Sequence, residues 1–404
     1  MNTLLIMKSK YEKDILPFIE DFGAFINFIL EKDPDLSNKT QVLGKNLCFE
    51  LNSHLHFQRT AIKASYTQEQ YIAIDLFFKL AVKSRLFLIQ INNKNKFKLI
   101  KTVCLEEFLN LNIYEKYVFL LEVFWTTYDF EEELRHNVFE FIELLNVISK
   151  TNSYSKIFKN DVGYGGFFSY YSKITRILRI LGICELEFID SVKSKYDDSI
   201  KSIMPTDFGR EISKTLITAL DYINIEDYII SILKERLNLK NSEEDKAFIE
   251  IISMVFEPKL ISKTINCNVE INKKGTYILK VLLGKNLWRV LKLSHNTTFH
   301  ELHLLIQQAF DFDNDHMYAF YTGTSRRTGK ELYSANPFGE SDEYEELTIE
   351  EADIYKGQQF IYLFDFGDMW EFKIQVMDFI ENEESTPQII ESKGESPQQY
   401  PDWD

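Results

Sequence analysis

The sequence has few cysteines, the residues that form disulfide frameworks and many structural zinc sites. Its 404 residues include four cysteines, Cys48, Cys104, Cys184 and Cys267, which are widely separated and form no CxxC pair. Disulfide frameworks and zinc sites both use closely spaced or patterned cysteines. The cysteine pattern therefore excludes a zinc ribbon or a disulfide-stapled fold, and it predicts buried free thiols in a reducing cytoplasm.

Long apolar runs are also missing. No run of the sequence reaches the roughly 18–20 apolar residues that span a bilayer. The short apolar run Leu4–Met7 has no basic segment before it, so it does not have the pattern of a signal peptide. We therefore predict a cytoplasmic protein with no membrane partner.

An excess of positive charge is the third absence. The chain has 46 basic and 62 acidic residues and a net charge of −16. A protein that coats nucleic acid over its whole surface needs many Lys and Arg contacts with phosphate, so the composition excludes that class. The charge is uneven, however: residues 273–404 carry −12, and the other 272 residues carry about −4. Local basic surfaces are therefore expected only in the first two thirds.

What the chain does contain is enough apolar material for buried cores, with 45% hydrophobic and 14% aromatic residues. Its length predicts two to four domains at about 100–200 residues each. In the first two thirds, Phe18, Phe22, Phe25, Ile26 and Ile29 recur at helical spacing. Further helices are predicted over residues 69–81, 113–125, 138–147, 167–181 and 245–256.

Two segments of this α-rich region repeat the order helix, hairpin, helix. In the first, strands 86–91 and 97–100 enclose a polar turn, and Thr102 opens the next helix. In the second, strand 183–188 pairs with a strand that ends before Thr206. Threonine is a good N-cap residue. This order resembles winged-helix modules, so we predict winged-helix-like domains over residues 1–150 and 151–260.

The last third changes to a strand-rich pattern. Hairpins are predicted for residues 277–293 and 360–376, and the Thr298–Glu301 capping box opens a helix over residues 299–310. Residues 381–404 are polar and are predicted to run over the surface as a tail. The predicted fold class is therefore α+β and multidomain, with an α-rich N-terminal region and, over residues 265–404, a C-terminal α+β domain of hairpins packed with helices.

Short motifs in this last domain carry a family resemblance. They are Trp288-Arg289 on a strand, Leu302-His303 on the helix, Asp313-Asn314-Asp315-His316 after it, and the run Asp365-Phe366-Gly367-Asp368-Met369-Trp370. Together they resemble the plasmid pRiA4b ORF-3-like family over about residues 277–404. The resemblance implies a bacterial protein linked to mobile elements and to DNA, and it names no enzymatic activity. Where the family often has a histidine two positions after the tryptophan, this chain has Phe372.

Two interpretations of His316, Asp365 and Asp368 stay open. Carboxylates and imidazole could bind a metal or move protons, which would make the protein a metal-binding protein or a hydrolase-like enzyme. Alternatively, the two aspartates bond nearby backbone N–H groups in a tight turn. The missing histidine favours the second interpretation, and we identify no catalytic residue, metal ligand or cofactor.

The basic residues of the first two thirds are the candidates for nucleic-acid contact. One set lies around the first hairpin and the other forms a stripe on a predicted helix: Lys79, Lys83, Arg85, Lys94, Lys96 and Lys98, then Lys173, Arg176 and Arg179. Such residues fit phosphate contacts, a solvated surface, or a patch that docks on the acidic C-terminal domain.

The leading hypothesis is a non-enzymatic bacterial binding protein. It would contact DNA through the N-terminal basic runs and use the acidic C-terminal domain as an interaction module. A further alternative is a purely protein–protein role, in which the acidic domain docks a basic partner.

Overall fold

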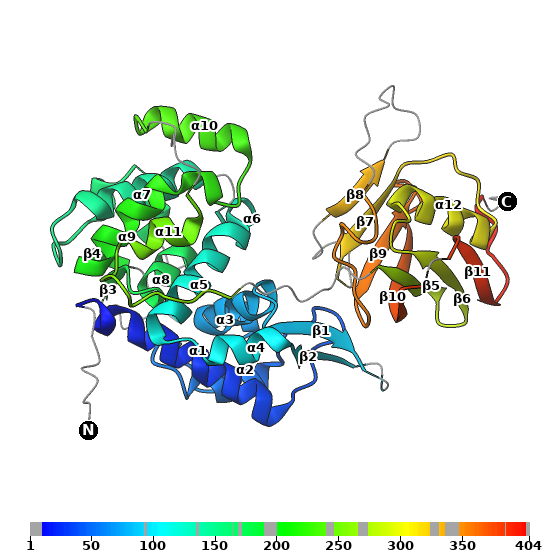
Figure 1. Ribbon diagram of the computed structural model, residues 1–404, viewed down its shortest axis with the longest axis horizontal. Helices are drawn as coiled ribbons and strands as arrows, with labels where there is room; N and C mark the ends of the chain where they lie inside the picture. The colour runs from blue at the N-terminus through cyan, green and yellow to red at the C-terminus, as the bar shows by residue number, and fades with distance from the viewer. Residues whose placement is uncertain are drawn as a thin grey trace. The chain divides into compact units, whose positions relative to one another are not determined.

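The computed structural model describes residues 10–92, 94, 96–134, 137–163, 165–168, 172–189, 200–239, 246–265, 274–323, 331–335, 347–383 and 385–400. The chain forms two compact units. The first consists of Met1–Lys32, Gly44–Phe87 and Thr102–Cys267, and the second of Asp33–Leu43, Leu88–Lys101 and Asn268–Asp404. The α+β fold class is confirmed, with a helical N-terminal unit and a strand-rich C-terminal unit (Figure 1).

The first unit contains the helices α1 to α11. Their bounds are α1 Glu12–Lys32, α2 Lys45–Asn52, α3 Ile72–Lys83, α4 Val103–Leu109, α5 Ile113–Thr127, α6 Phe130–Leu134, α7 Val138–Lys150, α8 Lys173–Ile180, α9 Asp207–Thr218, α10 Asp227–Arg236 and α11 Phe248–Ser253. The predicted helix over residues 167–181 is too long, because Gly165–Phe168 form a 3₁₀ turn that buries both phenylalanine rings. None of the described helices is long and apolar enough to cross a membrane.

Two hairpins interrupt these helices. They pair β1 Phe87–Ile91 with β2 Phe97–Lys101, and β3 Cys184–Phe188 with β4 Ile200–Pro205. All of the β1–β2 hairpin except Phe87 belongs to the second unit. There the Ile91 N–H donates to the Gly357 carbonyl oxygen at 2.9 Å, and the Phe97 carbonyl accepts from the Leu36 N–H at 2.8 Å.

The predicted repeat of helix, hairpin and helix is present, and both copies are closed by the same bonds. The Thr102 hydroxyl donates to the Arg85 carbonyl oxygen at 2.6 Å and caps α4. The Thr206 hydroxyl donates to the Gly182 carbonyl oxygen at 2.8 Å and caps α9. Arg85 and Gly182 both have a positive φ, 59° and 76°. The winged-helix resemblance of these segments stays a prediction.

The second unit is built on a seven-stranded antiparallel sheet in the order β11-β6-β5-β10-β9-β7-β8. The strands are β5 Gly275–Gly284, β6 Leu287–Ser294, β7 Tyr318–Thr322, β8 Glu331–Ala335, β9 Gln359–Phe364, β10 Trp370–Glu381 and β11 Gln388–Lys393. The helix α12, Phe299–Phe310, packs on one face of the sheet (Figure 1). Its capping box between Thr298 and Glu301 is present as predicted.

Two expectations from the sequence are wrong. The C-terminal segment is not only a surface tail, because Gln388–Lys393 pairs with β6 as the edge strand β11. Its backbone pairs with the free edge of β6, and Ile389 packs against the core of the sheet. Cys48 and Cys184 are buried free thiols as predicted, but Cys104 is disulfide-bonded.

The hydrogen bonds of Thr206, which link the second hairpin to α9, can be tested by mutation. Thr206 is 3% exposed, and its hydroxyl also accepts from the Gly209 N–H at 2.8 Å. In the Thr206→Ala variant, α9 loses its cap and the Gly182 carbonyl loses a donor, so we expect a loss of about 1–2 kcal/mol of unfolding free energy. Thermal unfolding followed by far-UV circular dichroism measures it. Thr218→Ala removes an exposed threonine of the same helix and should change stability by less than about 0.5 kcal/mol; equal effects of the two substitutions would contradict the assignment.

Candidate functional site

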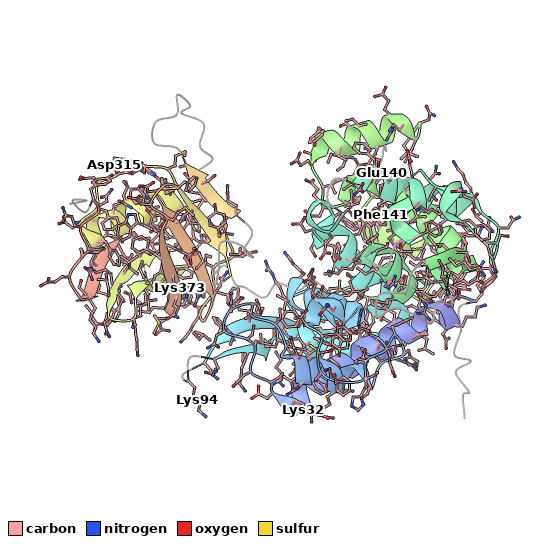
Figure 2. The ribbon with its side chains drawn as sticks, turned by 180° about the vertical axis from the view of Figure 1, so that it is seen from behind. Lys32, Lys94, Glu140, Phe141, Asp315 and Lys373 are labelled. Atoms are coloured by element: carbon pink, nitrogen blue, oxygen red, sulfur yellow. The ribbon has the colours of Figure 1, made fainter. Side chains whose placement is uncertain are left out.

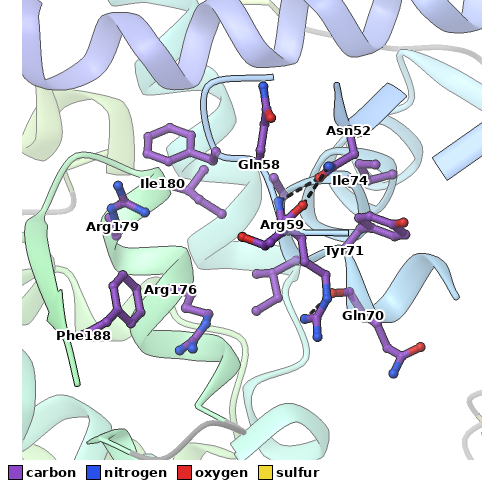
Figure 3. A pocket seen from close by; sticks show the side chains of 14 residues that line it. Asn52, Gln58, Arg59, Gln70, Tyr71, Ile74, Arg176, Arg179, Ile180 and Phe188 are labelled. Atoms are coloured by element: carbon purple, nitrogen blue, oxygen red, sulfur yellow. Dashed lines mark hydrogen bonds between the residues drawn. The ribbon is translucent and has the colours of Figure 1, made fainter. Parts of the chain in front are cut away.

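A pocket of about 220 Å³ lies in the N-terminal unit, between the segment that joins α2 to α3 and the helix α8. Three of the side chains that line it are arginines: Arg59 from the joining segment, and Arg176 and Arg179 from α8. Figure 3 shows Arg59 on one side of the pocket and the two α8 arginines on the other. Three guanidinium groups around one cavity are suited to an anionic ligand.

The joining segment is fixed by Asp21, a residue of α1 that is 1% exposed. One carboxylate oxygen accepts from the His56 backbone N–H at 2.7 Å and lies 2.7 Å from His56 Nδ1. The other accepts from the Phe57 N–H at 3.0 Å. A buried carboxylate needs such donors to offset the cost of leaving water. Asp21 therefore holds the segment in place where Phe57 lines the pocket.

Arg59 is positioned at both its backbone and its side chain. The Asn52 side-chain amide donates to the Arg59 carbonyl oxygen at 2.9 Å and accepts from the Arg59 N–H at 2.8 Å, the dashed lines between these residues in Figure 3. The Arg59 guanidinium donates to the Gln70 carbonyl oxygen at 3.1 Å and lies 4.2 Å from the centre of the Tyr66 ring. The guanidinium is therefore held in one orientation before any ligand arrives.

The α8 arginines share one face of their helix because they are three residues apart. The Arg176 guanidinium lies 5.4 Å from the centre of the Phe188 ring, and that of Arg179 lies 5.5 Å from the centre of the Phe57 ring. Arg179 Nε is 3.5 Å from a carboxylate oxygen of the exposed Glu185. Arg176 and Arg179, two of the residues predicted to contact nucleic acid, thus both line the pocket, each beside an aromatic ring.

Other predicted contacts lie in ion pairs. Lys173 Nζ is 2.8 Å from Asp75 and 2.7 Å from Glu133, and Lys79 pairs with the same two carboxylates. Burial alone would raise the pKa of Asp75, but the charges of Lys173 and Lys79 hold that pKa below its usual value. These lysines therefore join α3, α6 and α8. Lys83, at the end of α3, is exposed.

The lysines of the first hairpin differ in their surroundings. Lys94 and Lys96 are exposed in the turn between β1 and β2, and Figure 2 shows Lys94 at this tip. Lys98 donates to the Asp33 carbonyl oxygen at 2.8 Å and pairs with the Asp33 carboxylate. Arg85 lies in the turn that closes the repeat. Nucleic-acid contact by this group stays a prediction.

Arg59, Asn52 and Asp21 were not among the residues predicted from the sequence. Arg59 is a single basic residue in a polar segment, and neither a charge run nor a helical period marks it. Only the packing of this segment near α8 reveals that Arg59 shares a pocket with Arg176 and Arg179.

The family-motif residues lie in the C-terminal unit, and Arg289 ties its elements together. This arginine is 5% exposed. Its guanidinium donates to the Ala309 carbonyl oxygen at the end of α12, to the carbonyls of Lys393 at the end of β11 and of Gly394 after it, and to the Ser396 hydroxyl. Arg289 therefore fastens the edge strand and the helix to β6.

His303 is fully buried in a hydrogen-bond network. Its Nδ1 lies 2.7 Å from the Tyr362 hydroxyl, and its Nε2 lies 2.8 Å from Asn314 Oδ1. Gln307 donates to the same hydroxyl at 2.6 Å, and the Tyr318 ring stacks on the imidazole at 3.6 Å. Burial lowers the pKa of His303 to about 4. The imidazole is therefore neutral near pH 7, with Nε2–H donating to Asn314 and the tyrosine hydroxyl donating to Nδ1.

The Asp365 carboxylate closes the turn between β9 and β10. Asp365 has a φ of 55°, and its Oδ1 accepts from the N–H groups of Gly367 at 2.7 Å and Asp368 at 3.3 Å. His316 Nε2 lies 3.4 Å from its other oxygen. These bonds are those expected of a turn aspartate.

The metal alternative receives no support from this geometry. Within the described ranges, which include His316, Asp365 and Asp368, no group of three or more His, Cys, Asp or Glu residues is placed to hold a metal ion. The two motif tryptophans pack in the fold: the Trp370 ring meets Phe312 edge-on at 5.0 Å, and Lys280 lies 4.1 Å from the centre of the Trp288 ring.

Comparisons with known proteins agree with the predicted resemblance. Residues 276–400 match the family model described as plasmid pRiA4b ORF-3-like protein. The crystal structure of a protein of unknown function from Methanosarcina mazei Go1 matches with 22% sequence identity and a TM-score of 0.25, over 31% of this chain and 74% of that chain. No curated protein matches. The match to the family model confirms the resemblance of the C-terminal domain to this family.

The buried His303 predicts a pH dependence. Its pKa of about 4 in the folded protein lies below the value of about 6.5 for an unfolded histidine. The unfolded chain thus binds more protons between these values, so the unfolding free energy should fall by roughly 3 kcal/mol as the pH falls from 6.5 to 4. Urea unfolding followed by tryptophan fluorescence, to which Trp288 and Trp370 contribute, measures this slope.

Two variants test whether the pH dependence of the unfolding free energy comes from His303. Glutamine at position 303 keeps hydrogen-bonding capacity but does not titrate, so His303→Gln should flatten the dependence by about one proton. His54→Gln, at an exposed histidine of the N-terminal unit, is the control for the loss of an imidazole outside this network and should keep the slope. If His303→Gln does not fold, imidazole NMR of the wild type decides, and titration of His303 near pH 6.5 would contradict its buried neutral state.

Proposed function

We propose that this chain is a nucleic-acid-binding protein without an enzymatic role, and that Arg59, Arg176 and Arg179 contact the phosphates. The observation that carries the proposal is the meeting of three guanidinium groups around one pocket. A guanidinium presents a planar fork of donors that matches a phosphate group. Arginine is also one of the residue types that most often contact phosphate groups in protein–DNA complexes.

The preorganised setting of these arginines supports the proposal. Arg59 is held by Asn52 and by the Gln70 carbonyl, and the α8 arginines lie over aromatic rings. Side chains that are already ordered lose less conformational freedom when a ligand binds. Binding through a local cluster is compatible with a net charge of −16 for the whole chain.

The C-terminal domain has a different place in this proposal. Residues 273–404 carry a net charge of −12, which would repel phosphate and attract a basic protein. We infer that this domain docks a basic protein partner while the N-terminal unit contacts DNA. A bacterial origin and a link to mobile elements are part of the same proposal, and the plasmid-related family resemblance supports them. A cytoplasmic location is proposed with them.

Fluorescence anisotropy of a labelled DNA duplex, titrated with the full chain at low and at physiological salt, tests the phosphate contacts. Loss of a hydrogen-bonded charge should weaken binding roughly tenfold for each of Arg59→Ala and Arg176→Ala. The slope of log affinity against log salt should fall by about one for each arginine.

Arg236→Ala is the matched control. Arg236 is an arginine of α10 in the same unit, and it lines a different pocket. Its removal should leave affinity within about twofold, since Arg236 does not line the arginine pocket. Lys94→Glu with Lys96→Glu measures any contribution of the hairpin. Binding that is unchanged in Arg59→Ala and Arg176→Ala would contradict the proposal, as would the absence of binding at low salt.

A further inference from the structure

The arginine pocket also has an apolar side, which a phosphate group alone does not require. Ile74 and Ile180 line it and are 0% and 4% exposed. Phe57 and Phe188 line it as half-buried rings. An isolated phosphate is strongly hydrated and gains nothing from an apolar wall. The lining therefore fits a ligand that joins an anionic group to an apolar, planar one.

The aromatic rings lie beside the guanidinium groups, so the two kinds of contact are close together. Arg176 pairs with Phe188 and Arg179 with Phe57. Aromatic rings and arginine planes are the surfaces on which unpaired bases stack, and basic groups beside them follow the phosphates. This is the combination that a nucleotide unit needs.

The size of the pocket limits the ligand. A volume of about 220 Å³ is below the roughly 300–1,000 Å³ of pockets that hold drug-sized molecules. The space fits the base of one nucleotide, whose phosphate then meets the arginines that border it. A base that is still stacked and paired within a duplex cannot enter, because its neighbours come with it.

We propose that this pocket holds one unstacked nucleotide, with its phosphate on the arginines and its base against Phe188, Phe57 and the isoleucines. The inference rests on the proposed function and narrows it to unpaired nucleotides. The same chemistry is offered by an unpaired residue of a nucleic-acid strand and by a free nucleoside monophosphate, and the arms of the experiment separate the two sources.

The test compares a short labelled oligothymidine with a duplex of the same length, titrated with the full chain. Single strand should bind at least tenfold more tightly than duplex. Unlabelled thymidine monophosphate should displace the single strand at concentrations at least tenfold below those of inorganic phosphate, because the base adds stacking.

Two substitutions locate the effect in the pocket. Phe188→Leu keeps an apolar side chain but removes the ring, and should weaken single-strand binding by roughly fivefold or more. Duplex binding should weaken by a smaller factor, because it loses only the ordering of Arg176 by the ring. Arg176→Lys keeps the charge but loses the planar group, and should also weaken it. Phe158→Leu, at a ring that is 45% exposed and does not line the pocket, is the control and should have no effect.

The possible outcomes distinguish failure of the nucleotide pocket from failure of the proposed function. Equal binding of single strand and duplex, with no effect of Phe188→Leu, overturns the nucleotide pocket and leaves the proposed phosphate contacts in place. Displacement by inorganic phosphate as effective as that by thymidine monophosphate also overturns it, since the site then recognises only an anion. If no nucleic acid binds, the proposed function fails; calorimetry with thymidine monophosphate then either supports a free-nucleotide pocket or, with no heat of binding, overturns it as well.

Discussion

The arrangement of the N-terminal unit depends on a nearly buried carboxylate, that of Asp75 on α3. A charge in such a place is unfavourable unless it is paired, and its partners are Lys79 on the same helix and Lys173 on α8. Glu133 of α6 accepts from the same two lysines. The pairing favours one placement of α8 near α3. The pocket lies between the joining segment and α8 in that placement, so ion pairs outside the pocket help to bring its arginines together.

The two helix–hairpin–helix segments are stabilised by the same pair of hydrogen bonds, although their sequences differ. Thr102 and Thr206 make the same pair of bonds, to a carbonyl at the end of the preceding helix and to an N–H in the first turn of the next. Both carbonyls belong to residues in the left-handed region. The first copy uses Arg85 there, whereas the second needs Gly182, because a Cβ atom would lie 2.1 Å from the Asp14 carbonyl oxygen. The two segments therefore share a backbone conformation, while the residue at the left-handed position differs with the space that its neighbours leave.

Local signals predicted much of the fold, and non-local contacts account for the rest. The helix over residues 299–310 and its capping box could be predicted because Thr298 and Glu301 bond within one turn. The turn at Asp365 is local in the same way. In contrast, β11 forms because β6 offers a free backbone edge and Ile389 reaches the core, while most of its other residues are polar. Arg59 could not be predicted as a site residue, since its role comes from packing near α8, more than a hundred residues away.

The edge position of β11 has a consequence for the behaviour of the protein in concentrated solution. A flat outer strand with open backbone groups is a template on which other chains can add and aggregate. Here the pairing with β6 shifts register between Ile389 and Glu391, which interrupts a flat outer edge. Glu391 and Lys393 add exposed charges along it. The same strand that completes the sheet thus discourages its uncontrolled extension from one molecule to the next.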